Sequence, residues 1–259
     1  MIRNLLIISG AGLILAIVGI GGAFAVGGRD RARHDWTWVI TDDEAGDSGF
    51  TVERGQVSPD TTRTIEWTGG DRLAINIPAD VVYDQQADTP GITVSGAQSV
   101  VERVRFSNGR LTLDEAPRGD RSYVRWTRTG IRGWSETDAL KIIIKAPSVK
   151  AFDLSGPTEL KIRGYDQPSL DLTLTGSSDV RVQGRTDAVT VDVSGAGDAR
   201  MDELIVDDAK VRVSGSGEVR VGPSGKAEVD VSGSGEVRLT RRPAELRQSV
   251  SGSGEVTED

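Results

Sequence analysis

A short unit with a period of about 20 residues recurs through the second half of this 259-residue chain. Its clearest copies read VRVSGSGEVR at 211–220 and VDVSGSGEVR at 229–238. The first glycines of six copies follow one another at nearly constant spacing: Gly156, Gly176, Gly195, Gly215, Gly233 and Gly252. A further copy is expected at Ile92–Ala97, since Gly96 precedes Gly156 by three such periods. This repetition predicts a stacked solenoid, because one unit cannot bury its apolar face alone.

Each copy alternates between apolar and polar residues on both sides of its glycine corner. Val211 and Val213 share one face of the chain while Arg212 lies on the other, and residues 218–221 resume the alternation. A period of two indicates a strand, and glycine permits the sharp bend between two strands. Coils stacked in register form a parallel β-helix whose neighbouring strands lie about 4.8 Å apart. The sequence therefore predicts an all-β solenoid with aliphatic side chains inside.

The region before Gly156 is less regular but is also rich in strand patterns. Strands are predicted at Arg72–Ile77, Ile92–Ser95, Arg110–Leu113 and Leu140–Lys145, with prolines between them. Segments 36–39 and 50–53 are expected to form a small sheet over the first coil, because a solenoid needs a cap at its end.

Leu5–Val26 is a long apolar run without a charged side chain. About 20 apolar residues span a bilayer as a helix. Arg3 and the small residues at 23 and 25 fit a cleaved signal peptide, whereas the length of the run fits an uncleaved anchor. Three arginines within 29–33 favour a cytoplasmic location for the segment after the run, but charge is a weak guide before a long domain. We expect export, with membrane anchoring through residues 5–26 preferred over cleavage.

Composition narrows the chemistry of the chain. It carries 31 Lys and Arg against 39 Asp and Glu, a net charge of −8, which argues against a nucleic-acid partner. The absence of cysteine excludes disulfides, thiolate metal sites and cysteine nucleophiles. The single histidine, His34, leaves almost no room for a Ser-His-Asp triad or a multi-histidine metal site. We therefore expect no enzymatic activity, cofactor or metal.

An acidic residue follows each glycine corner, and a basic residue usually lies two positions later. In the stack these residues are predicted to form two neighbouring charged rows, either a mutually paired solvated surface or a face that binds a polymer, a surface or a partner. The acidic row is Glu159, Asp179, Asp198, Glu218, Glu236 and Glu255. The basic row is Lys161, Arg181, Arg200, Arg220 and Arg238, with Thr257 in the last copy. Calcium is disfavoured here, because calcium-binding β-rolls repeat every nine residues and the arginines compete for the carboxylates.

Arginine and aromatic residues interleave in a second candidate region, at Arg121, Tyr123, Arg125, Trp126, Arg128 and Trp134. Guanidinium groups and aromatic rings together can hold glycans or anionic polymers. The alternative interpretation is a surface hairpin whose aromatic rings shield the end of the solenoid.

The SGSGEVR copies, and Leu140–Val149 before them, resemble the putative auto-transporter adhesin, head GIN domain family. The resemblance covers residues 60–256. Residues 1–27 before it are expected to be a signal peptide or anchor and residues 28–59 a linker and cap, and residues 257–259 are expected to be a short tail. It implies a right-handed, single-stranded parallel β-helix in the bacterial cell envelope.

The leading functional hypothesis is an exported, non-enzymatic, adhesin-like module that binds a cell-surface polymer, glycan or protein, or serves a structural role. One alternative is a polysaccharide-active lyase or hydrolase, since such enzymes also use parallel β-helices. Another is an envelope scaffold or sensor tethered beside a partner. Because fold alone cannot assign chemistry, the site has to decide between them.

Overall fold

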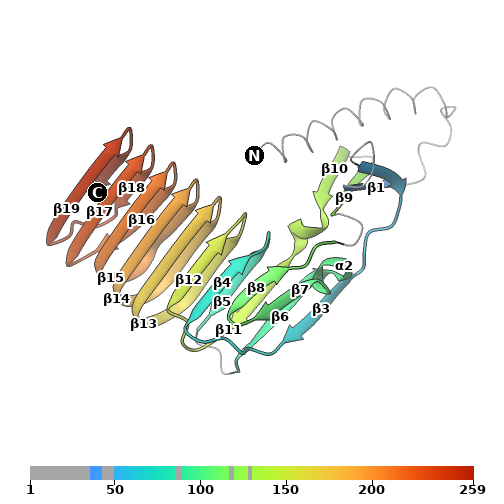
Figure 1. Ribbon diagram of the computed structural model, residues 1–259, viewed down its shortest axis with the longest axis horizontal. Helices are drawn as coiled ribbons and strands as arrows, with labels where there is room; N and C mark the ends of the chain where they lie inside the picture. The colour runs from blue at the N-terminus through green and yellow to red at the C-terminus, as the bar shows by residue number, and fades with distance from the viewer. Residues whose placement is uncertain (1–35, 43–49, 86–88, 117–119, 128–129) are drawn as a thin grey trace.

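The computed structural model describes residues 36–42, 50–85, 89–116, 120–127 and 130–259. These residues form two sheets with very little helix, which confirms the all-β prediction (Figure 1). The smaller sheet is antiparallel, in the order β10-β9-β1-β2, and consists of β1 (Trp36–Asp42), β2 (Phe50–Arg54), β9 (Arg121–Thr127) and β10 (Gly130–Ser135). The larger sheet has 16 strands and winds into a β-solenoid.

The solenoid is built from two groups of strands. The regular stack consists of β12 (Ala151–Ser155), β13 (Glu159–Gly176), β14 (Asp179–Gly195), β15 (Asp198–Gly215), β16 (Glu218–Pro223), β17 (Lys226–Gly233), β18 (Glu236–Leu239), β19 (Glu245–Gly252) and β20 (Glu255–Glu258). Its N-terminal end consists of β3 (Asp60–Ile65), β4 (Arg72–Asn76), β5 (Asp80–Asp84), β6 (Gly91–Ala97), β7 (Val104–Ser107), β8 (Arg110–Leu113) and β11 (Lys141–Lys145), with helix α2 (Gln98–Val101) and the 3₁₀ helix η1 (Glu136–Ala139).

Neighbouring coils of the regular stack pair in parallel and in register. The corner glycines lie beside one another from coil to coil, Gly176 next to Gly195, then Gly215, Gly233 and Gly252. The inward positions also form rows, one of which runs through Leu172, Val191, Val211 and Val229, all buried. Alternation in the sequence therefore becomes an aliphatic interior, as predicted, and each fully buried valine or leucine contributes roughly 1.5–3 kcal/mol of transfer free energy.

The corners need glycine because the coils approach closely there. Gly195 has φ +127° and Gly233 has φ +120°, a left-handed conformation that side chains with a Cβ rarely adopt. A Cβ on Gly195 would lie 2.5 Å from the carbonyl oxygen of Gly176 in the coil below, and one on Gly233 would lie 2.6 Å from that of Gly215. The Ser-Gly units thus allow both the bend and the stacking.

The first coil is separated in sequence from the coil that stacks on it. β4 pairs with β12 and β5 pairs with β13, both in parallel, so residues 72–84 form a coil directly below residues 151–163. The intervening residues include β6 to β11 and cover the N-terminal end. Tyr83 links the two parts, because its hydroxyl donates to the Ala146 carbonyl (2.6 Å) and accepts from the Val149 amide (3.3 Å). Burial raises the pKa of Tyr83 to about 12.

The expected repeat copy at Ile92–Ala97 does not belong to the parallel stack. It forms β6, which pairs antiparallel with both β11 and β3. Its separation of three periods from Gly156 is therefore coincidental, because the coil below Gly156 is residues 72–84. The other strands predicted before Gly156 are confirmed as β4, β8 and β11.

The last described coil of the solenoid consists of β19 and β20. β19 pairs with β17 and β20 with β18, and no described strand covers their outer edges. Val250 in this last coil is 44% exposed. At two inward positions the last coil has a polar residue where the coil before it has an apolar one: Gln248 lies beside Val229, and Glu258 lies beside Leu239. These polar residues limit the apolar surface at the outer edge of β19 and β20.

The predicted membrane helix over residues 5–26 lies outside the described ranges. Within those ranges, no helix is long and apolar enough to cross a membrane.

Candidate functional site

The register brings the predicted charged residues together in two rows on one face of the solenoid, which we call the ladder face. The acidic row runs through Glu159, Asp179, Asp198, Glu218, Glu236 and Glu255. The basic row runs through Lys161, Arg181, Arg200, Arg220 and Arg238 and ends at Thr257. Asp80 extends the acidic row by one coil beyond the prediction.

Acid and base mostly pair within one strand of the ladder face. The ion pairs are Arg200–Asp198 (3.2 Å), Arg220–Glu218 (2.5 Å) and Arg238–Glu236 (3.2 Å). Glu159 instead receives two cations, Lys161 of its own strand (3.1 Å) and Arg181 of the next coil (2.5 Å). Among the described residues, Asp179 and Glu255 have no cation within ion-pair distance. The ladder face is thus close to neutral locally, but its charges repeat from coil to coil.

Pairing keeps both signs of charge on this face. Hydrogen bonding from Lys161 has the largest effect and lowers the pKa of Glu159; burial opposes it, and hydrogen bonding from Arg181 lowers the pKa further. The hydrogen bond to Glu218 raises the pKa of Arg220. Both groups therefore remain ionised near neutral pH.

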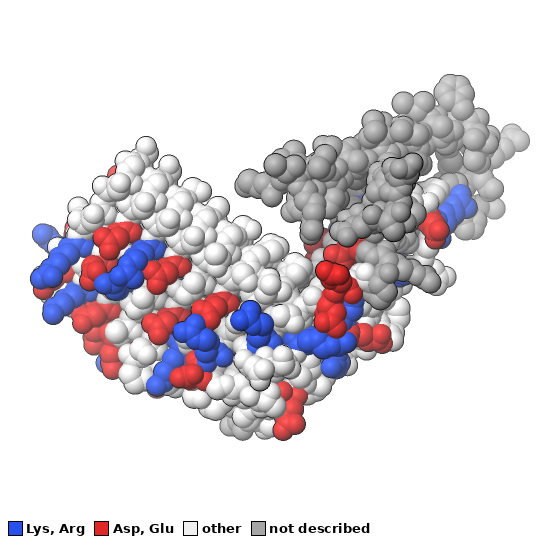
Figure 2. Space-filling model, viewed as in Figure 1, with Lys and Arg blue, Asp and Glu red and all other residues white. Residues whose placement is uncertain are grey.

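A second charged face was missed in the sequence reasoning. It is built from the strand segments that precede the glycine corners and carries the ion pairs Lys210–Glu228 (2.5 Å), Arg212–Asp192 (3.5 Å) and Arg247–Glu245 (2.8 Å). The signal was present as the polar residue between the two valines of each copy. In Figure 2, charged side chains form bands across the coils, whereas the edge that bears the glycine corners carries almost no charge.

A shallow hollow of about 240 Å³ lies on this second face. Its lining includes Val189, Ala209 and Ala227, which lie side by side in successive coils. Its acids are already engaged, since Glu228 and Glu245 pair with cations and Asp208 accepts the Lys226 amide (2.7 Å). In the described part of the chain, no three His, Cys, Asp or Glu side chains converge as a metal site.

The structure brings three of the predicted arginine and aromatic residues, Tyr123, Arg125 and Trp134, together in the hairpin of β9 and β10. Arg121, Tyr123, Arg125 and the backbone of Trp126 belong to β9, and Trp134 belongs to β10, where it lies opposite Tyr123. The Trp134 ring stacks on Tyr123 (5.6 Å between centroids), and the Arg125 guanidinium lies 5.7 Å from the centre of the Trp134 ring. Tyr123 is only 1% exposed and cannot contact a glycan. Arg128 lies outside the described residues.

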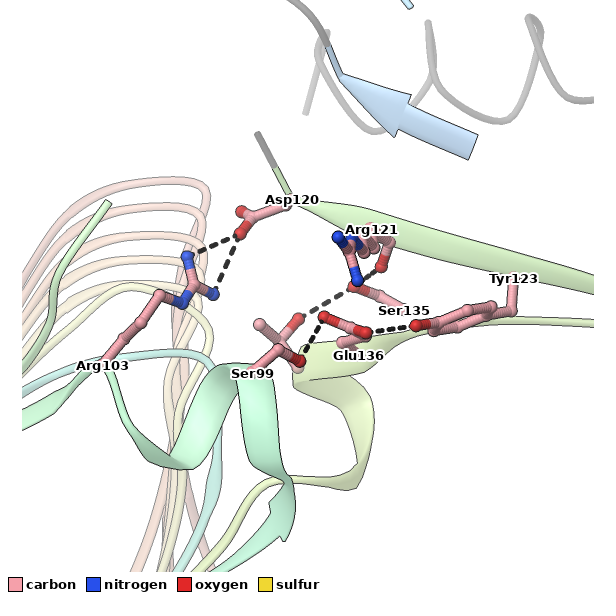
Figure 3. A network of polar contacts seen from close by, with 8 residues as sticks. Ser99, Arg103, Asp120, Arg121, Tyr123, Ser135 and Glu136 are labelled. Carbon is pink, nitrogen blue, oxygen red and sulfur yellow. Dashed lines mark hydrogen bonds and ion pairs between the residues drawn. The ribbon is translucent and has the colours of Figure 1, made fainter. Parts of the chain in front are cut away.

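Tyr123 instead forms part of a joint between the small sheet and the solenoid (Figure 3). Its hydroxyl donates to Glu136 of η1, and Ser99 of α2 donates to the other carboxylate oxygen of Glu136 (2.8 Å). Glu136 is 6% exposed, and burial followed by the contact with Glu136 raises the pKa of Tyr123. The Arg103–Asp120 ion pair (3.1 Å) lies beside this network. Sequence reasoning missed the joint, because nothing in the chain relates Ser99 to Glu136.

Comparisons with known proteins support the fold. No curated protein matches the chain. A crystal structure of a putative adhesin from Bacteroides fragilis is similar with a TM-score of 0.61 and 15% identity, over 78% of this chain and 97% of that one. A putative lipid binding protein from Parabacteroides distasonis (TM-score 0.42, 17% identity, 77% and 96% covered) and a putative adhesin from Parabacteroides merdae (TM-score 0.42, 16% identity, 77% and 96% covered) are more distant.

The family model for the putative auto-transporter adhesin, head GIN domain matches residues 71–243. This range starts at the first coil and ends just before β19, so it covers the solenoid apart from β3 and the last coil, together with the residues inserted after the first coil. The chain belongs to the putative auto-transporter adhesin, head GIN domain family.

Proposed function

We propose that the protein is an exported, non-enzymatic envelope protein that binds an extended surface polymer along its ladder face. The observation that carries this proposal is the constant register of acid and base over successive coils. Strands about 4.8 Å apart repeat the same pair of charges, which matches a ligand that is itself a repeating chain. Membership of an adhesin-like family and the apolar run at 5–26 support a location in the envelope.

The acids of the structure favour binding over catalysis. A polysaccharide-active enzyme needs a carboxylic acid and a second carboxylate placed on either side of the scissile bond. On the ladder face the acids recur with the repeat, and most are paired with a cation. In the hollow they are also engaged, so repetition and pairing account for them without a reaction.

Binding of immobilised envelope polysaccharide tests the proposal. We expect the triple variant Arg181→Gln, Arg200→Gln, Arg220→Gln to bind at least several-fold more weakly than the wild type. The matched control removes the same number of positive charges from the second face, with Lys210→Gln, Arg212→Gln and Arg247→Gln. Equal weakening of binding by both variants would show that binding depends only on the net charge of the protein, and this would contradict the proposal. Release of shorter polysaccharide chains would favour the enzymatic alternative.

Protease treatment of intact cells tests the location. Export predicts that the solenoid is accessible once the outermost barrier of the envelope is opened, while cytoplasmic marker proteins stay intact. A solenoid that stays protected until the cytoplasmic membrane is lysed would exclude adhesion.

A further inference from the structure

Tryptophan is concentrated in the small antiparallel sheet. The chain has five tryptophans, and four of them belong to the strands of this sheet: Trp36, Trp38, Trp126 and Trp134. Trp36 and Trp126 are direct partners in the register of β1 and β9. The fifth, Trp67, stacks on Phe106 (5.0 Å between centroids) and packs against the solenoid core.

An arginine side chain lies beside two of these tryptophans, Trp38 and Trp134. The Arg54 guanidinium lies 5.6 Å from the centre of the Trp38 ring, and Arg125 lies 5.7 Å from that of Trp134. The four strands carry Arg54, Arg121, Arg125 and Arg132 against only Asp42 and Glu53. A chain with a net charge of −8 therefore has a basic excess in its tryptophan-rich sheet.

This combination matches the chemistry of a membrane surface. Tryptophan is enriched at the level of lipid headgroups, where its ring meets the apolar region and its N–H meets water. Basic side chains near an anionic leaflet are attracted by its negative surface potential. Glycans also stack on aromatic rings, but the buried Tyr123 and the Trp134 ring stacked on it leave less aromatic surface for a sugar.

A short linker keeps the small sheet close to the apolar run at residues 5–26. Nine residues, 27–35, separate Val26 from the start of β1 at Trp36. A fully extended chain covers at most about 3.5 Å per residue, so the ten steps from Val26 to Trp36 span about 35 Å at most. An anchor at residues 5–26, which is part of the proposed function, therefore holds the sheet near the bilayer.

We propose that the small sheet is a membrane foot, which rests on the phospholipid headgroup layer with Trp38 and Arg54 in contact with lipid. The joint of Tyr123, Glu136 and Ser99 connects the foot to the end of the solenoid. Docking of the foot would then set the direction in which the solenoid leaves the membrane. The inference rests on the anchoring part of the proposed function.

Quenching of tryptophan emission by brominated lipids tests the foot. The full-length chain is reconstituted into vesicles of phosphatidylcholine and phosphatidylglycerol, in single-tryptophan variants that keep either Trp38 or Trp67 and carry Phe at the other four positions. Lipids brominated high on the acyl chain should quench Trp38 several-fold more than Trp67, since Trp67 packs on the solenoid. Equal quenching of the two would overturn the proposal.

Two further readouts separate the ways in which the proposal can fail. Flotation of the vesicles reports anchoring, so a chain that does not float overturns the anchor, whereas a floating chain with an unquenched Trp38 overturns the foot alone. A Trp38 emission that responds to added oligosaccharide but not to brominated lipid would assign the sheet to glycans. If a single-tryptophan variant does not fold, the conservative variants Trp38→Phe and Trp67→Phe decide, because only the first should lower the quenched fraction.

Discussion

At the scale of single residues, the corner glycine and the charged pair beside it have different roles. The glycine is needed because a Cβ would meet the coil below, as at Gly233, where the Gly215 carbonyl oxygen leaves no room. The charged pair is half-buried at the surface, and the charges of its two members compensate each other. Position in the repeat therefore separates residues on which folding depends from residues that are available for binding.

Substitution of the corner glycine should destabilise the protein far more than substitution of its neighbour. Gly233→Ala forces a left-handed φ on a residue with a Cβ and pushes against the Gly215 backbone, at a cost on the order of 1–3 kcal/mol. Ser232→Ala changes an exposed hydroxyl and should stay within about 0.5 kcal/mol. Urea unfolding of both variants measures the difference. A Gly233→Ala protein as stable as Ser232→Ala would contradict the close approach of the coils.

Glu159 should contribute to stability above acidic pH. Its pKa is lowered in the folded state, mainly by Lys161, so its contribution is present above the unfolded-state pKa of about 4.3. The contribution is lost as the pH falls through the folded-state pKa. Glu159→Gln should therefore flatten the fall in unfolding free energy between about pH 5 and pH 3.

Glu255→Gln is the control for this effect. Glu255 lies in the same row, but Thr257 stands where the other coils carry a cation. Melting temperatures measured across the acidic range should change their slope for Glu159→Gln and much less for Glu255→Gln. The same slope change in both variants would show that the cations beside Glu159 are not its cause.

At the scale of elements, each strand has an inner side that holds the stack together and an outer side that carries charge. Val213 lies between Val193 and Val231 in one inward row, so three consecutive coils meet at this side chain. Glu218, on the next strand, points outward and pairs with Arg220. The two sides of a strand should therefore respond very differently to substitution.

Val213→Asp should unfold several coils, because it buries a carboxylate without a partner at a cost of several kcal/mol. Glu218→Gln removes one half of a half-buried surface ion pair and should cost about 1 kcal/mol or less. Circular dichroism and hydrogen exchange of the backbone amides in β14 to β17 measure both effects. Equal destabilisation by the two variants would be inconsistent with the inward and outward assignment.

At the scale of the whole molecule, the sequence predicts the regular stack well and its beginning poorly. From Gly156 onward the sequence repeat predicts the strand register, because each coil is one repeat long. The inward valines of one coil therefore lie beside those of the coil before it. The first coil escapes detection for two reasons. Its corner reads Asn76-Ile77-Pro78-Ala79 instead of Ser-Gly-Ser-Gly, and the coil above it begins at residue 151.

The candidate site also has one part that the sequence predicts and one part that it does not. The charged rows follow from the repeat, so the sequence predicts which residues become neighbours. The joint of Ser99, Tyr123 and Glu136 depends on tertiary contacts between segments with no shared pattern, and the burial of Tyr123 follows from it. The sequence alone leaves Tyr123 either as a glycan contact or as an aromatic side chain that shields the end of the solenoid, whereas the structure gives its hydroxyl a hydrogen bond to Glu136 inside the molecule.

The central claim, a parallel stack in register, is tested most directly by distances along one row. The chain has no native cysteine, so nitroxide labels can be placed at the outward positions Ser155, Ser232 and Ser251. Ser155 and Ser232 are four coils apart, and Ser155 and Ser251 are five coils apart. Pulsed electron paramagnetic resonance should give narrow distributions near about 19 Å and about 24 Å, one strand spacing apart. Broad distributions, or a distance that does not increase with the added coil, would contradict the solenoid.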